Sequence, residues 1–150
     1  MSYPDLSRLL AELNERALEL NVESNSINSV ISSVEHQIRN ANVGIEVWLE
    51  GDQAIAVETT FYYDHNARPV QGRHETQIGF AKLDEAWSIA VREKTSYADG
   101  KSRVGVSPLL KASRDTRLAA LEKLPALIIQ LRTAAENAVA AIRQARKLIE

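Results

Sequence analysis

Two short groups of histidine and carboxylate residues are the first candidates for chemistry in this 150-residue chain. Asp64 and His65 precede an expected loop, and His74 and Glu75 follow it. Imidazole and carboxylate groups are zinc ligands, so a hairpin that joined the two groups would supply a metal site. Their spacing matches no helical or turn-based ligand motif, however. We therefore interpret them as exposed polar residues at a loop mouth, and we predict no metal and no other cofactor.

Catalytic motifs are not evident in the rest of the sequence. The chain has no cysteine, which excludes thiol nucleophiles, disulfides and thiolate metal sites. It has no G-x-S-x-G turn and no glycine-rich phosphate loop. Glu46, Glu50 and Glu58 are expected on one sheet face, where a carboxylate pair could perform acid–base chemistry. A solvated face explains them equally well, so we assign no catalytic residue and favour a non-enzymatic protein.

The same face of the expected sheet carries aromatic residues among small and charged ones. Trp48 and Tyr62 lie there together with Glu46, Glu58 and Arg92. Exposed aromatic side chains surrounded by polar residues are typical of interfaces, so these five residues predict a surface that binds a ligand or a partner. The alternative is that a loop or the N-terminal helix covers this face.

The most basic part of the chain is residues 92–117, where seven basic residues outnumber three acidic ones. Clustered lysine and arginine residues are what phosphate contacts require, so this segment is the candidate for nucleic-acid binding. The overall net charge of −2 and the glutamates of the sheet argue against that function. The sequence therefore argues against nucleic acid as a partner.

The composition is that of a soluble globular protein, with 45% hydrophobic and 25% charged residues. The opening residues contain no apolar run of signal-peptide length. The densest apolar stretch, residues 124–129, is far too short to span a bilayer. We expect one domain over residues 1–150, located in the cytoplasm and not in a membrane.

Apolar residues in the first third of the chain recur every three or four positions, which predicts a helix. They form two heptad rows typical of a coiled-coil seam. The rows are Leu6, Leu13, Leu20, Ile27 and Val34, and Leu10, Ala17, Ser24, Ile31 and Ile38. Residues 21–29 are rich in weak helix formers, so the sequence leaves open either one continuous helix or a break near Ser24 or Ser26.

The last third of the chain has the same spacing and predicts a second long helix, beginning near Ser107 and Pro108. Pro125 lies inside this pattern and predicts a kink or a fresh start. Residues 1–42 carry three arginines and six acids, whereas residues 118–150 carry five basic residues and three acids. Opposite charges favour the two helices as neighbours. The residues predicted at the helix interface are Leu13, Leu20, Ile27, Ile31, Leu131, Ala135, Ala138 and Ile142.

Between the helices, apolar and polar residues alternate and predict four strands in an antiparallel meander. A two-residue turn at Asp84 and Glu85 would pair Phe80 with Ile89. A three-residue loop at 51–53 would pair residues 49 and 55. A short extended piece is expected at 104–106. The apolar face is expected to contain Val47, Val57, Ile78, Phe80, Trp87 and Ile89.

These elements predict an α+β fold with a long N-terminal helix, a four-stranded antiparallel meander and a long kinked C-terminal helix. We expect the helices to pack antiparallel to each other on one sheet face. The favoured function is protein–protein interaction or assembly through the long helices, as a homodimer or with a protein partner. The alternatives are a small-ligand binder or enzyme that uses the Trp48 and Tyr62 face, and a nucleic-acid binder that uses residues 92–117.

Overall fold

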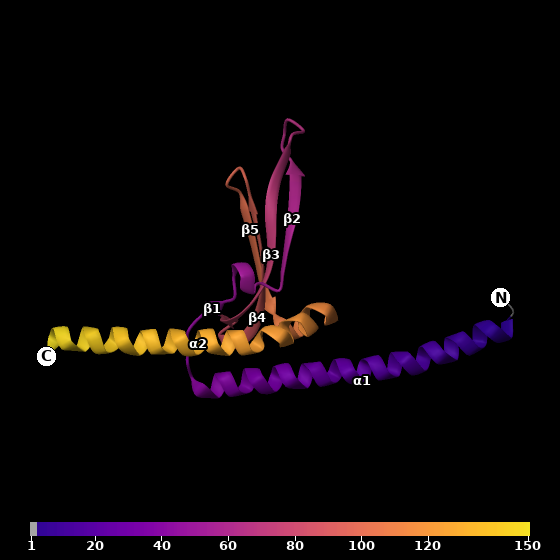
Figure 1. Cartoon of the computed structure of the whole chain (residues 1–150), viewed down its shortest axis with the longest axis horizontal. Coiled ribbons are helices and arrows are strands. Elements are labelled where there is room, and N and C mark those ends of the chain that lie inside the picture. Colours follow the sequence, from indigo (N-terminus) through magenta and orange to yellow (C-terminus); the bar gives the residue numbers. More distant parts are fainter. Residues whose placement is uncertain (1–2) are drawn as a thin grey trace.

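The computed structural model describes residues 3–150 and shows the predicted α+β class. Two long helices lie along each other at the base of an antiparallel sheet whose strands stand away from them (Figure 1). The helices are α1 (Tyr3–Ala41) and α2 (Arg114–Ile149). The strands are β1 (Val47–Trp48), β2 (Ala56–Tyr63), β3 (Pro69–Leu83), β4 (Ala86–Tyr97) and β5 (Ser102–Pro108), with 3-10 turns at Gly51–Gln53 and Leu109–Lys111.

Helix α1 is continuous, which decides between the two possibilities left open by residues 21–29. Ser24 in this polar stretch is buried and accepts a hydrogen bond from Arg114 Nε at 2.8 Å. The helix ends at Ala41, where Asn42 adopts a left-handed conformation with φ 54°. Asparagine tolerates this conformation better than most residues, so Asn42 is well suited to end the helix.

Helix α2 begins later than the sequence predicted. Ser107 and Pro108 belong to β5, where Pro108 pairs with Ala90 of β4. The next residue, Leu109, is fully buried in the core, and the helix starts only at Arg114. Ser113 is its N-cap and accepts a hydrogen bond from the Thr116 amide. The prediction was wrong because strand pairing and burial of Leu109 outweighed a good local helix-start signal.

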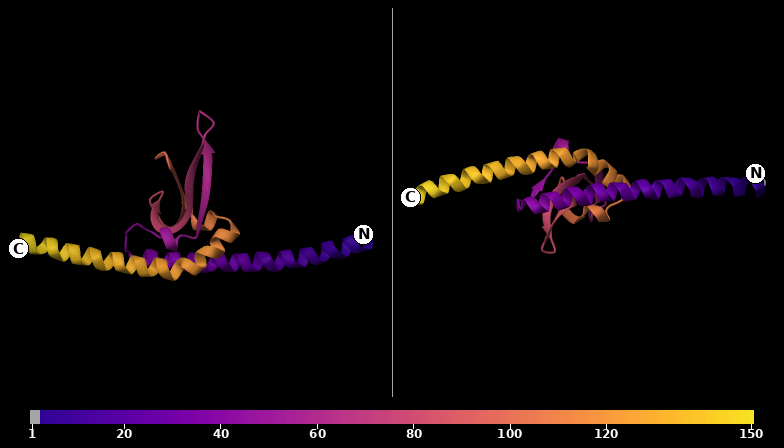
Figure 2. Two further views of the ribbon diagram at one scale, coloured as in Figure 1. Left: turned by 45° about the horizontal axis from the view of Figure 1, so that its top comes forward. Right: turned by 90° about the horizontal axis from the view of Figure 1, so that it is seen from below.

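Pro125 lies inside α2, as predicted. The helix changes direction within its first half (Figure 2). A proline in a helix interior removes one backbone hydrogen bond and clashes with the preceding turn. The bend therefore has an identified chemical cause in the sequence.

The sheet has five strands rather than four. Strand order is β1-β3-β4-β5, and β2 also pairs with β3. The extended piece expected at 104–106 is therefore a full strand, β5, paired with β4.

The expected pairing of residues 49 and 55 is wrong. Strands β1 and β2 do not pair with each other but follow one another along the same 15-residue strand, β3. The 3-10 turn Gly51–Gln53 separates them, and its Gly51 amide donates to Glu75 Oε1.

The hairpin between β3 and β4 matches its prediction. Phe80 pairs with Ile89 and Ile78 pairs with Val91. The two loop residues, Asp84 and Glu85, have φ of 47° and 70°. Two positive φ values are the signature of a type I′ turn, whose backbone twist suits a two-residue hairpin.

We expect Glu85→Gly to raise the free energy of unfolding by about 1 kcal/mol, because glycine carries no steric penalty at positive φ. Urea denaturation monitored by tryptophan fluorescence would measure the change. Glu85→Ala is the matched control, since it removes the same charge but keeps a Cβ at this position. An equal gain from both variants would show that turn strain is not the cause.

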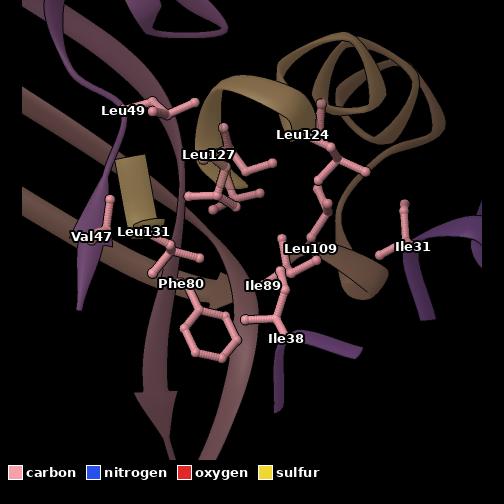
Figure 3. Packing of buried hydrophobic residues seen from close by; sticks show 13 residues of the cluster. Ile31, Ile38, Val47, Leu49, Phe80, Ile89, Leu109, Leu124, Leu127 and Leu131 are labelled. Carbon is pink, nitrogen blue, oxygen red and sulfur yellow. The ribbon is translucent and has the colours of Figure 1, made fainter. Parts of the chain in front are cut away.

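The core lies where the helices meet the base of one sheet face, as predicted. Side chains from α1, α2, β1, β3 and β4 converge there (Figure 3). Val57 was expected among them but is exposed. It lies on β2, which pairs with the part of β3 beyond the helices. The core residues include Ile31, Ile38, Val47, Leu49, Ile78, Phe80, Ile89, Leu109, Leu124, Leu127 and Leu131.

The helices run parallel, and the antiparallel expectation is wrong. Their contacts advance in the same direction along both: Arg114 bonds to Ser24, and Arg117 Nη1 donates to Asn28 Oδ1. Farther along, a shared groove is lined by Val34–Ala41 residues of α1 and Ile128–Ala135 residues of α2. Both helices run from right to left in Figure 1.

Candidate functional site

The two helices overlap along only about half of their length, and each projects beyond the body at an opposite end (Figures 1 and 2). We call residues 5–23 of α1 the N-terminal arm and residues 136–149 of α2 the C-terminal arm. Every side chain of the N-terminal arm is exposed except the half-buried Ala17. Every side chain of the C-terminal arm is exposed except the half-buried Ala138. Among the residues that the structure describes, no other element is therefore packed along either arm.

Both arms expose large apolar side chains. The heptad rows that bury Ile27, Ile31, Val34 and Ile38 against the core continue without a change of phase into the N-terminal arm. Contiguous exposed apolar stripes of this length are rare on the surfaces of monomeric proteins. The exposed large apolar residues are Leu6, Leu9, Leu10, Leu13, Leu18, Leu20 and Val22 on one arm, and Val139, Ile142, Leu148 and Ile149 on the other.

The eight residues predicted at a helix interface divide into two groups. Ile31 and Leu131 are 0% and 3% exposed, and they join the two helices inside the chain. Ile27 and Ala135 are partly buried beside them. The other four lie on the arms, where Leu13 and Ile142 are 61% and 59% exposed. These four are Leu13, Leu20, Ala138 and Ile142.

The arms carry opposite net charges. The N-terminal arm has five acidic and two arginine residues, which gives −3. The C-terminal arm has three basic residues and one glutamate, which gives +2. Because they point in opposite directions, the two arms of one chain do not meet (Figure 2). The charge match inferred from the sequence is therefore not satisfied inside the chain along these segments.

An apolar groove of about 320 Å³ lies at the point where α1 ends and the C-terminal arm begins. It is lined by residues from the ends of both seams, among them Ile38, Val43, Leu131 and Ala135. The groove extends the seam between the helices towards the C-terminal arm. An apolar side chain arriving from outside could occupy it.

Trp48 belongs to a packed cluster on the sheet. Its ring lies against Gly79, and Arg92 stacks on it with 4.5 Å between the guanidinium carbon and the ring centroid. Arg92 also donates to the buried Gln77 Oε1 at 2.7 Å and to Glu50 Oε1 at 2.6 Å. Arg92 is thus held by two hydrogen bonds and by stacking on Trp48, and its side chain is only 17% exposed.

Tyr62 belongs to a different cluster near the far end of the sheet. It pairs with Val70, nine residues along β3 from the Trp48 partner Gly79. That separation corresponds to about 30 Å of strand. The structure therefore does not bring Trp48 and Tyr62 together into the single surface that the sequence predicted. Glu46 and Glu58 are exposed and contribute to neither cluster.

The surroundings of Tyr62 come from the β4–β5 hairpin. Its ring packs edge-on against Tyr97, and Lys101 Nζ lies 5.3 Å from the ring centroid. Its hydroxyl donates to Asp99 Oδ2. An open pocket of about 450 Å³ lies beside these groups and is also lined by Arg103. Sequence reasoning missed Tyr97, Asp99 and Lys101, because no periodicity joins them to Tyr62.

The hydrogen bond to Asp99 raises the pKa of Tyr62 above its usual value of 10.0 and lowers the pKa of Asp99 below 3.8. A raised tyrosine pKa means that the bond stabilises the fold below pH 10, and that this contribution is lost as the pH rises through the pKa of the folded protein.

We expect Asp99→Asn to move the pKa of Tyr62 down towards its usual value. Phenolate absorbance, taken as the difference from a Tyr62→Phe variant, would measure it. Asp64→Asn on the other hairpin should leave the titration unchanged, and an equal shift from both would contradict the assignment.

The basic residues of 92–117 do not form one patch. Arg92 is engaged by Trp48, Gln77 and Glu50, whereas Arg114 and Arg117 bind Ser24 and Asn28 of α1. Lys101 lies near the far end of the sheet against Tyr62. Arg92, Arg114 and Arg117 are thus engaged near the helices, whereas Lys101 and Arg103 line one pocket near the far end of the sheet.

The two histidine groups are also separated. His74 lies within β3, where its Nδ1 is 2.7 Å from the hydroxyl oxygen of Thr95 on β4. His65 lies in the turn between β2 and β3, next to Asp64, whose side chain accepts from the amides of Asn66 and Arg68. Within residues 3–150, no three histidine or carboxylate side chains are grouped so that they could hold a metal ion.

Within the part of the chain that the structure describes, neither helix has a stretch long and apolar enough to cross a membrane. Comparison with protein-family models, with curated proteins and with solved structures gives no match to this chain.

Proposed function

We propose that this protein is a non-enzymatic assembly subunit that associates with further copies of itself through its two helical arms. The observation that supports this most directly is the exposure of both arm seams. An isolated helix in water gains little from its own hydrogen bonds, and most helical stability comes from packing of an apolar face. The N-terminal arm is about 28 Å long, and a partner that packed along its apolar face would stabilise this helix.

The charges of the arms favour a second copy as that partner. Each arm meets its opposite charge on another molecule of the same chain, and charges of opposite sign guide partner choice and orientation. The sheet would then project from the assembled helices, with the tips of the β2–β3 and β4–β5 hairpins farthest from the contact (Figure 1). In this proposal the body positions the arms, and the arms perform the function.

Self-association is tested by the molar mass in solution as a function of protein concentration, by light scattering. We expect the mass of the wild-type chain to rise with concentration. A variant with Leu10→Glu, Leu13→Glu and Ile142→Lys should remain a monomer, because these substitutions put charges on the seams but preserve the sign of each arm. The substituted side chains are exposed, so the free energy of unfolding of the monomer should stay nearly unchanged.

Matched controls are Leu18→Glu on the N-terminal arm and Leu148→Lys on the C-terminal arm. Both side chains are exposed but lie outside the seam rows. These variants should associate as the wild type does. A wild-type chain that remains a monomer at every concentration would refute the proposed function.

A further inference from the structure

We infer that the copies join head to tail, with the N-terminal arm of each copy packed in parallel on the C-terminal arm of the next. This inference rests on the proposed function and specifies which surfaces meet. A contact between two different surfaces of the same chain does not close on itself after two copies. It therefore predicts a chain of copies rather than a symmetric dimer.

The first argument is the continuity of the seams. Inside the chain, the α1 seam faces α2 as far as Ser24, which bonds to Arg114 at the beginning of α2. Before Ser24 the same seam continues into the N-terminal arm, where α2 is no longer present. The seam of α2 likewise continues past Leu131 into the C-terminal arm, where α1 has already ended. Each arm thus presents the face that is already used for helix packing.

The second argument is the length of the helices. Helix α1 has 39 residues and α2 has 36, and they lie parallel with a stagger of about half their length. Shifting a second copy along the helices by the length of α1, about 58 Å, places its C-terminal arm beside the N-terminal arm of the first. The α1 helices then follow one another end to end. This single shift gives the whole C-terminal arm and most of the N-terminal arm a partner.

The third argument is charge. Pairing unlike arms brings a net −3 against a net +2, whereas pairing like arms brings −3 against −3 or +2 against +2. Like charges on neighbouring helices are destabilising, and the effect excludes wrong pairings more than it adds affinity. The charges therefore favour unlike arms over both symmetric alternatives.

The shift also gives a register. Ile38 and Leu131 line one groove, so we place them side by side in the intrachain seam. Moving the neighbour by 39 residues of helix then sets Leu6 against Ala138, Leu10 against Ile142 and Leu13 against Ala145. The large side chains of one arm thus meet small or branched residues of the other, which is how closely packed helices interdigitate.

The decisive experiment mixes two variants that each lack one arm surface. One is the N-arm variant (Leu10→Glu, Leu13→Glu), and the other is the C-arm variant (Ile142→Lys, Ala145→Lys). Each retains one intact arm, and the head-to-tail contact needs one arm of each kind. We expect each variant alone to be a monomer and an equimolar mixture to reach twice the monomer mass and no more, while the wild type grows beyond two copies.

The direction of the arms is tested by cross-linking, which the absence of native cysteine makes unambiguous. Separate Leu6→Cys and Ala138→Cys chains are mixed and oxidised, and we expect a disulfide-linked pair. Leu6→Cys mixed with Ile149→Cys should give little product, since these positions lie at opposite ends of a parallel contact. Leu6→Cys alone should give no dimer through like arms.

Three results would overturn the inference. They are a mixture of the two variants that remains monomeric while the wild type associates, a dimer formed by either variant alone, and preferential linkage of Leu6 to Ile149. Each would leave the proposed function in place, because the wild type would still associate. Failure of the wild type to associate at all would refute the proposed function instead, so the two failures are distinguishable.

Discussion

Replacing Gly79 with alanine is expected to lower the free energy of unfolding by about 3 kcal/mol, at the upper end of the cost of overpacking. A Cβ at this position would lie 2.3 Å from Trp48 Cε3 and 2.4 Å from the carbonyl oxygen of Val47. The ring could shift, but the carbonyl belongs to the short strand β1, which pairs with β3 at this point. We therefore expect β1 to separate from β3 and the burial of Val47 and Leu49 to be lost.

Urea unfolding followed by circular dichroism would measure this loss. Gly105→Ala is the matched control, because a Cβ at Gly105 meets nothing within 4 Å and the residue has no positive φ. We expect the control to be neutral or slightly stabilising, since alanine loses less backbone freedom on folding than glycine. Equal unfolding midpoints for Gly79→Ala and the wild type would show that Trp48 does not pack on this strand as described.

Phe80→Ala is expected to have the largest effect in the core, a loss of about 3–5 kcal/mol in the free energy of unfolding. Phe80 is 1% exposed and stacks on Trp87 with ring centroids 5.4 Å apart. It lies where both helices meet the sheet (Figure 3), so the cavity would be shared by several elements and could not close by moving one side chain. Domains of this size are stable by only about 5–15 kcal/mol, so the variant would be close to unfolding.

The control is Phe61→Ala, which makes the same change on β2 at an exposed ring. Phe61 contacts Tyr63 edge-on, so we expect a cost below about 1 kcal/mol. Thermal denaturation of both variants beside the wild type would measure the difference. A loss of similar size in the two variants would contradict the placement of the core at the base of the sheet.

Local patterns in the sequence predicted the elements that depend on near neighbours. The alternation around Asp84 and Glu85 specified the hairpin register, since a shift of one residue would have moved Phe80 and Ile89 off the core face. The unbroken heptad phase agrees with the continuous α1 through its polar stretch. Pro125 predicted an irregularity in α2. Each of these follows from steric or periodic rules that act within a few residues.

Predictions failed where a distant segment decided the outcome. Ser107 and Pro108 had a good helix-start pattern, yet they pair with β4 as the end of β5. The pairing between residues 49 and 55 was expected because hairpins are local, but β3 is long enough to accept β1 and β2 in succession. The grouping of Trp48 with Tyr62 followed from alternation alone. Alternation gives the face of a residue but not its distance along a twisted, elongated sheet.

The sequence by itself determined which side chains share a face: apolar seams along both helices, an apolar face on the strands, and arms of opposite charge. Periodicity is enough for this, because it depends only on backbone geometry. Only the tertiary structure decided that the helices run parallel and staggered, so that Ile31 and Leu131 are covered within the chain while Leu13 and Ile142 are not. An apolar seam in the sequence indicates that a helix packs against another element. Which part of that helix is covered depends on how the strands between the two helices place them relative to each other.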